Sequence, residues 1–270
     1  TIANADFSGK QLDSAILDNS LISNVKFANA KTTVPTENTY DHFHMAVTLN
    51  NSTVLDSDFS NSEFKGGFKI NGTTLKNVDF SKSEIMGFKS YESGNESYFE
   101  NVDFSDCTFK EISLYQSECM KDVKFDNSKM GKVYFKFGDG SSNVSLKGVS
   151  VSGDMEIFGT VDGLDISKAS GSSNGVALAN ATINRLNAKE FNVSGCYLSV
   201  SGRAYAAGII DKSKITNADF SGSNFITPTI LSVTESYAIS GLTVRNSSIT
   251  NGVFNNSTFS AKISETKMDN

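Results

Sequence analysis

The chain has 270 residues, of which 38% are apolar and 20% are charged, and its formal net charge is −6. This length and content predict one or two globular domains and exclude a disordered tail. They also exclude a membrane-spanning helix, because no stretch approaches the roughly 18 consecutive apolar residues that a span needs.

One short motif repeats along the chain. Its copies are NADFSG at 4–9, NVDFSK at 77–82, NVDFSD at 101–106, DVKFDN at 122–127 and NADFSG at 217–222. About twenty residues, or simple multiples of that length, separate the copies, as expected for a repeat architecture.

Within these blocks a large apolar residue returns every five residues. The runs, in chain order, are Phe7, Leu12, Leu17, Ile22, Phe27; Leu49, Val54, Phe59, Phe64; Ile70, Leu75, Phe80, Ile85; Phe99, Phe104, Phe109, Leu114; Met120, Phe125, Met130, Phe135; Ile210, Ile215, Phe220, Phe225, Ile230; and Val244, Ile249, Phe254, Phe259. Neither the helical period nor the strand period governs this spacing. It predicts short extended segments, each ending in a corner.

The residues around each large apolar position differ in size and flexibility. Two residues earlier the side chain is small or of medium size, as at Ala5, Val25, Ser62, Ser83, Cys107, Ser128 and Ser223. Two residues later Gly, Asn or Asp recurs, as at Gly9, Asn19, Asn24, Asn61, Gly66, Gly72, Asn77, Asp106, Asn127 and Asn251. These residues tolerate a positive φ, so we expect them at the corners.

Four such segments make a square coil of about twenty residues, and coils stack with a strand spacing of about 4.8 Å. ADFSG and NVDFS resemble the A(D/N)LXX motif of pentapeptide-repeat proteins, with Phe often in place of Leu. The resemblance is strong over 3–32, 47–135 and 208–262. It implies an all-β fold, the right-handed quadrilateral β-helix, and we expect about 12 coils of about 20 residues.

A single β-helix domain is expected over 1–270. The five-residue spacing is lost over 136–207, although pairs of apolar residues two apart persist, so irregular coils with bulges are expected there. Such pairs also fit the alternating strands of a β-sandwich, which leaves a second domain as the alternative.

Two interruptions, near 33–45 and 89–98, are predicted to protrude from the rod as loops. Rigid scaffolds often place recognition on such loops, and aromatic residues there are typical anchors. The predicted binding residues are Tyr40, His42, Phe43, His44 and Tyr91. The alternative is that the loops fold onto a flat face of the rod and shield these same side chains.

The chemistry-bearing residues favour neither a metal site nor a cofactor. His42, His44 and Asp41 lie within four residues, but a closed metal site needs three or four ligands and supporting contacts. Cys107 and Cys196 occupy small inward positions, so we expect packed thiols rather than metal ligands or a disulfide. No metal and no cofactor are therefore predicted.

Enzymatic activity is not predicted either. Acidic residues precede the central Phe at Asp6, Asp58, Asp79 and Asp103, but Lys26 and Lys124 occupy the same register. A column of mixed charges on an exposed face is usually solvated and does not amount to a pair of catalytic carboxylates.

The predicted function is a non-catalytic rigid scaffold or protein–protein interaction module of a bacterial protein, with a protein or flanking domains as partner. The family resemblance adds that it could be the β-helix part of a larger secreted effector. One alternative implied by the same resemblance is a DNA-mimicking protein that protects gyrase, although 24 basic residues among the acids make a poor copy of DNA. The other is a surface or filament protein that self-associates end to end. Direct nucleic-acid binding is not expected. No signal-peptide pattern is visible, so the location, bacterial cytoplasm or secreted, stays open.

Overall fold

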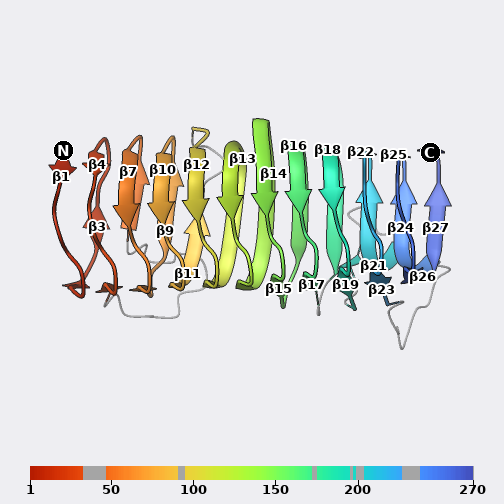
Figure 1. The fold of residues 1–270 in the computed structure, drawn as a ribbon, viewed down its shortest axis with the longest axis horizontal. Helices are drawn as coiled ribbons and strands as arrows, with labels where there is room; N and C mark the ends of the chain where they lie inside the picture. Colours follow the sequence, from red (N-terminus) through yellow and green to blue (C-terminus); the bar gives the residue numbers. More distant parts are fainter. Residues whose placement is uncertain are drawn as a thin grey trace.

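A computed structural model describes residues 1–32, 47–90, 95–171, 175–194, 197–198, 204–226 and 238–269. The described residues contain strands, turns and no helix, and the strands form one continuous system of stacked coils (Figure 1). Neighbouring coils pair in parallel almost everywhere. The all-β solenoid predicted from the five-residue period is therefore confirmed.

The strands are short in the first and last coils and longer in the middle. In the first half they are β1 (Ile2–Ala3), β2 (Gln11–Leu12), β3 (Ala15–Ile16), β4 (Leu21–Ser23), β5 (Lys31–Thr32), β6 (Val47–Asn50), β7 (Thr53–Asp58), β8 (Glu63–Phe64), β9 (Phe68–Asn71), β10 (Thr74–Asp79), β11 (Glu84–Lys89), β12 (Tyr98–Asp103), β13 (Thr108–Lys124) and β14 (Lys129–Ser145). In the second half they are β15 (Ser150–Val151), β16 (Met155–Asp165), β17 (Ser170–Gly171), β18 (Val176–Asn187), β19 (Asn192–Val193), β20 (Tyr197–Leu198), β21 (Ala204–Asp211), β22 (Lys214–Thr216), β23 (Asn224–Phe225), β24 (Ala238–Arg245), β25 (Ser248–Thr250), β26 (Thr258–Phe259), β27 (Ala261–Ser264) and β28 (Lys267–Asp269).

Each coil has four sides, which we name by their inward residues. Face A carries Ile22, Val54, Leu75 and Phe99; face B carries Phe27, Phe59, Phe80 and Phe104; face C carries Phe64, Ile85, Phe109 and Met130; face D carries Phe68, Phe88, Ile112 and Val133. Followed from coil to coil, the register on face A runs from Ile2 to Met268 in about 11 turns, against about 12 predicted coils.

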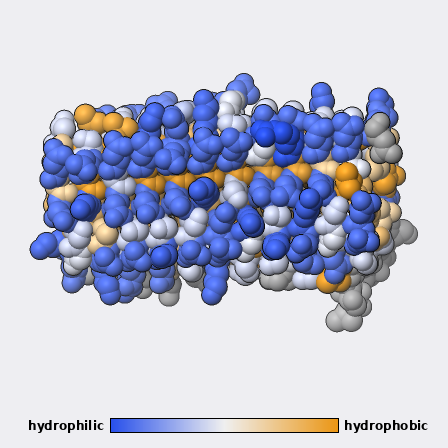
Figure 2. All heavy atoms as spheres, in the orientation of Figure 1, coloured by the Kyte–Doolittle hydropathy of each residue, from blue (hydrophilic) through white to orange (hydrophobic). Residues whose placement is uncertain are grey.

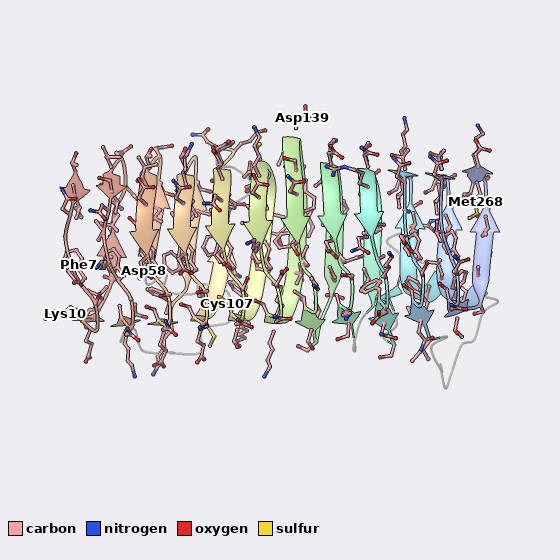
Figure 3. All side chains as sticks on the ribbon, in the orientation of Figure 1. Phe7, Lys10, Asp58, Cys107, Asp139 and Met268 are labelled. Carbon is pink, nitrogen blue, oxygen red and sulfur yellow. The ribbon has the colours of Figure 1, made fainter. Side chains whose placement is uncertain are left out.

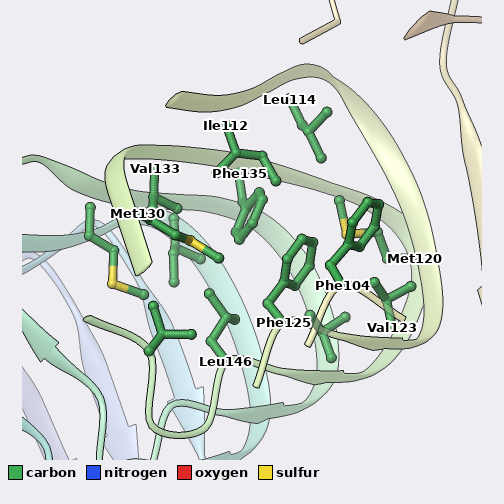
Figure 4. Packing of buried hydrophobic residues seen from close by; sticks show 14 of the residues in the cluster. Phe104, Ile112, Leu114, Met120, Val123, Phe125, Met130, Val133, Phe135 and Leu146 are labelled. Atoms are coloured by element: carbon green, nitrogen blue, oxygen red, sulfur yellow. The ribbon is translucent and has the colours of Figure 1, made fainter. Parts of the chain in front are cut away.

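The core is a set of ladders inside the coils. On face B the rings of Phe7, Phe27, Phe59, Phe80, Phe104 and Phe125 stack with successive centroid distances of 5.1, 4.7, 4.9, 4.8 and 4.9 Å. Aliphatic side chains of the other faces pack against these rings (Figure 4). The ring spacing equals the coil spacing, so one repeat places one ring on the next.

Small inward residues hold the coils together with hydrogen bonds. The Oγ of Ser62 donates to the carbonyl of Phe27 at 2.8 Å, and Ser83 and Ser128 donate to Phe59 and Phe104 in the same way. Cys107 takes the same position, with its Sγ 3.0 Å from the carbonyl oxygen of Phe80. Burial raises the pKa of Cys107 to about 12. This thiol is packed inside the coil, as predicted, whereas Cys196, for which the same was predicted, lies outside the described residues.

The corner residues adopt the left-handed backbone conformation, with a positive φ, as the sequence predicts. Among the predicted corner residues, Asn24, Asn77, Asp106 and Asn127 have φ between 50° and 58°. One prediction was a residue off, because the positive φ (74°) belongs to Gly67 and not to Gly66. A Cβ on Gly67 would stand 2.2 Å from the carbonyl oxygen of Gly87, so the coils approach there too closely for any side chain.

Regular stacking continues through the described part of 136–207. β14 pairs with β16, and β16 with β18, in parallel with register shifts at Phe137/Ser141 and Ile157/Gly159. The bulges therefore change the outline of the coils, while the inward ladder of apolar side chains continues. The outer surface in the orientation of Figure 2 is mostly hydrophilic, with a narrow apolar line along the rod.

Candidate functional site

The predicted binding residues lie outside the described residues. Tyr40, His42, Phe43 and His44 belong to 33–46, and Tyr91 belongs to 91–94, neither of which the structure describes. The predicted role of both loops stays a prediction.

Long connections between strands concentrate at one corner of the coil, between faces C and D. In a regular coil two residues lie between the flanking inward positions, as between Phe109 and Ile112. In three other coils 14, 14 and 16 residues lie between them: between Thr32 and Val47, Val193 and Gly208, and Phe225 and Leu242. The ladder keeps its register on both sides of each insertion, so this corner accepts insertions without a break in the stacking of the coils.

A short side sheet stands at the same corner. β20 runs antiparallel to the start of β21, with Tyr197 opposite Ala206, and the start of β24 pairs with β21 on its other side. Outward residues of face D lie buried beside it, as the small apolar cluster of Ala177, Ala206 and Ile209 shows. Face D is therefore partly covered by this chain in its C-terminal coils.

The aspartates of face B support the turns. The backbone N–H of Ser60 donates to Oδ1 of Asp58 at 2.9 Å (Asp58 is labelled in Figure 3), and Asp79 accepts from Ser81 at 2.7 Å. The same bond recurs from Ser105 to Asp103 at 2.8 Å. Each carboxylate thus caps its own corner, which explains its place before the central Phe without any catalytic role.

An outward cluster of aromatic side chains on face D was not predicted from the repeat. The ring of Tyr134 lies 4.3 Å from that of Tyr115 and 4.9 Å from that of Phe158, with interplanar angles of 40° and 30°. Lys132 and Lys136 alternate with the buried Val133 and Phe135 on β14, so both lysines share the outer side with Tyr134. We call Tyr115, Lys132, Tyr134, Lys136 and Phe158 the face D aromatic patch.

A polar network borders this patch on its N-terminal side. Lys89 Nζ lies 2.7 Å from Glu111 Oε2, with both side chains about one-fifth exposed, and the Oγ of Ser113 donates to Glu111 Oε1 at 2.6 Å. This network is well shielded, and it holds the carboxylate of Glu111 in place. Lys89 is therefore the last residue of β11 and has a partly buried partner, although the second loop was predicted to begin there.

Glu118 and Asp211 are the two carboxylates among the described residues that have a buried oxygen without a hydrogen-bond partner, and Glu118 is the one near this patch. Its Oε1 accepts the backbone N–H of Gln116 at 3.1 Å, whereas Oε2 has no hydrogen-bond partner. Burial raises the pKa of this carboxyl, so the neutral acid is favoured. The residue follows a register shift between Leu114 and Glu118, where the strand bulges at the corner.

The described ranges contain no group of three His, Cys, Asp or Glu side chains that could hold an ion. Nor do they contain a helix long and apolar enough to cross a membrane.

Sequence reasoning missed the face D aromatic patch because it followed only the inward residues. The signal was present: once Val133 and Phe135 are inward, Tyr134 between them must point outward. Tyr115 and Phe158 could not be aligned with it, because the bulges near them shift the five-residue count.

No protein-family model matches the chain, and no curated protein matches it. Among solved structures, it is similar to HetL, a pentapeptide repeat protein involved in heterocyst differentiation regulation from Nostoc sp. strain PCC 7120. The identity is 11%, the match covers 83% of this chain and 86% of HetL, and the TM-score is 0.47. It is also similar to QnrB1, a plasmid-mediated fluoroquinolone resistance protein (13% identity, 97% and 92% covered, TM-score 0.29), and to the A-module of the Azotobacter vinelandii mannuronan C-5 epimerase AlgE4 (12% identity, 96% and 77% covered, TM-score 0.32). These likenesses concern the solenoid fold alone.

Proposed function

We propose that this chain is a non-catalytic, rigid scaffold for protein–protein interaction in a bacterial protein, built as one β-helix. The observation that carries the proposal is the placement of three long connections at the corner between faces C and D. The ladder keeps its register on both sides of these connections, so the stacking of the coils does not fix their length. Insertions gathered at one corner of a rigid rod are typical of a recognition surface.

The outward charges support a scaffold more than a catalyst. Face B carboxylates accept hydrogen bonds from their own turns, and several other acids are paired with lysines, as Glu63 is with Lys65 at 3.0 Å and Glu100 with Lys76 at 3.0 Å. Carboxylates in such hydrogen bonds and ion pairs stabilise the surface of the rod rather than bind and turn over a substrate.

The same charges disfavour a DNA mimic. On face B, Lys26 precedes Asp58, Asp79 and Asp103 in register, and Lys124 follows them. Duplex DNA presents an uninterrupted row of negative charge, about one per 1.7 Å of axis. An acidic column broken by lysines on both sides copies that field poorly.

End-to-end association is the second candidate. Ile263 and Met268, inward residues of the last described coil, are 49% and 45% exposed. One more coil stacked on this end would bury them, whether it comes from a flanking domain or from another copy. Light scattering on the purified chain separates the two, because a monomer at all concentrations contradicts self-association.

The test of the scaffold function is replacement of each long connection by an Asn-Gly corner. Joining Thr32 to Val47 in this way should leave the β-rich circular dichroism and the melting temperature nearly unchanged, because both residues keep their ladder contacts. A partner first identified by affinity capture with the intact chain, then purified, should bind at least one of the three replacement variants more weakly. Unchanged binding to all three folded variants would contradict the proposal.

A further inference from the structure

The face D aromatic patch is unusual for an outward surface of this rod. In the outward column of face B, every residue from Asp6 to Asp165 is Asp, Lys or Ser, and these side chains bond to turns or meet water. On β14 the outward residues are instead Lys132, Tyr134 and Lys136, and the ring of Tyr134 joins those of neighbouring coils. The ladder inside the coil would be the same with Ser at position 134.

The two lysines of the patch are exposed and form no salt bridge with any described residue. Three acids on neighbouring strands are differently engaged or placed. Glu118, which interacts electrostatically with Lys136, is itself buried. Glu111, in register with Lys132, is held by Lys89 and Ser113. Glu156 is in register with Tyr134 on the next coil, so it places negative charge beside the rings and away from the two ends of the patch.

We propose that the face D aromatic patch binds an extended acidic peptide segment of a partner protein, with an apolar side chain over the rings and a carboxylate at each lysine. This proposal rests on the scaffold function and names the surface and the class of partner. Lys132 and Lys136 are four residues apart on one strand, about 13 Å. A peptide with the pattern Glu-x-Phe-x-Glu has the same span, and its central side chain then lies at Tyr134.

The ring geometry favours a peptide over a carbohydrate or a nucleic acid. Tyr134 contacts one ring on each side along the rod, at 4.3 and 4.9 Å, so its faces are already used. Sugars and bases stack on open ring faces, whereas an apolar side chain can pack against ring edges.

The proposal is tested by fluorescence anisotropy with three labelled peptides. The first contains Glu-Ser-Phe-Ser-Glu, the second Lys-Ser-Phe-Ser-Lys and the third Glu-Ser-Ser-Ser-Glu. The first should bind the intact chain at least about tenfold more tightly than either control, since losing the central apolar contact or reversing the charges removes an estimated 1.4 kcal/mol or more. Raising the salt concentration should weaken its binding.

Matched variants locate the site. The double variant Lys132→Glu and Lys136→Glu should lower the affinity for the first peptide about tenfold or more. The control variant, Lys124→Glu and Lys147→Glu, changes two exposed lysines away from face D by the same charge and should stay within about twofold of the intact chain. Circular dichroism confirms that both variants fold.

Several results would overturn the proposal. They are equal weakening by the two double variants, no saturable binding at about 1 mM peptide, or tighter binding of polygalacturonate or of single-stranded DNA at the same patch. None of these results bears on the proposed scaffold function. That function fails separately, through unchanged partner binding in all three connection variants.

Discussion

Replacing Phe104 by Ala is the sharpest test of the internal ladder. The Phe104 ring is fully buried and stacks on Phe80 at 4.8 Å and 11° and on Phe125 at 4.9 Å and 3°. Truncation of a buried Phe costs about 3–5 kcal/mol, because the cavity adds to the lost transfer energy. Loss of two stacked ring pairs, each worth about 0.5–1.5 kcal/mol, places this variant in the upper half of that range.

The assay is urea unfolding followed by far-ultraviolet circular dichroism, because the chain has no Trp to report by fluorescence. Ser105, the next residue, is half-buried and outward, so Ser105→Ala should change the unfolding free energy by no more than about 0.5 kcal/mol. Phe104→Leu should cost under about 1.5 kcal/mol, since Leu146 fills the same column two coils later. Equal effects of Phe104→Ala and Ser105→Ala would refute the assignment of inward and outward residues.

Three further predictions test the corners, a buried acid and the close approach of coils. Asn77→Ala should cost about 1–3 kcal/mol in urea unfolding, because Ala tolerates the φ of 54° poorly and the bond from Asn101 Nδ2 (3.0 Å) is lost; Asn77→Gly should recover part of this. Burial raises the pKa of Glu118, so the folded chain binds this proton more tightly than the unfolded chain does. The stabilisation from this bound proton is complete below the ordinary pKa of Glu and is lost as pH rises through the raised pKa. In melting temperatures measured against pH, the Glu118→Gln variant should lack this loss of stability. Gly131→Ala should lower the melting temperature, because the new Cβ would stand 2.2 Å from the carbonyl oxygen of Lys110; an unchanged melting temperature would show that the coils are less tightly stacked.

The five-residue period is sufficient to predict the ladder and most corners. One column holds Phe80, Phe104 and Phe125, because one large side chain per side of the coil is the only arrangement that buries all of them. The chain turns at Asn77 and Asn127, where a positive φ is needed. Gly67 was misplaced by one residue because two consecutive glycines fit the same corner, and only the approach of Gly87 decides between them.

The outer features were harder to predict, because they depend on contacts between coils. Glu118 is buried by a bulge, and a bulge adds residues that no period specifies. To predict that the long connections share one corner, each run of apolar residues must be assigned to a face of the coil. That assignment requires the five-residue spacing to continue across 136–207, where it is lost. To predict the face D aromatic patch, one must know which residues of β14 point outward and how the bulged strands that carry Tyr115 and Phe158 align with it.

The central claim is that the coils form one rigid rod on which recognition elements are displayed. Lys26 and Asn187 are outward in the same column of face B, seven coil steps apart, through Asp58, Asp79, Asp103, Lys124, Ser145 and Asp165. At about 4.8 Å per coil their separation is about 34 Å.

Spin labels at positions 26 and 187 would measure this distance by pulsed electron paramagnetic resonance. The native cysteines would be replaced by Ser, which already fills the Cys107 position in neighbouring coils at Ser83 and Ser128. A rigid rod predicts a single narrow distance distribution near about 34 Å, plus the length of the labels. A broad distribution, or a maximum far from this distance, would contradict the stacked-coil scaffold and the display of recognition elements along one edge.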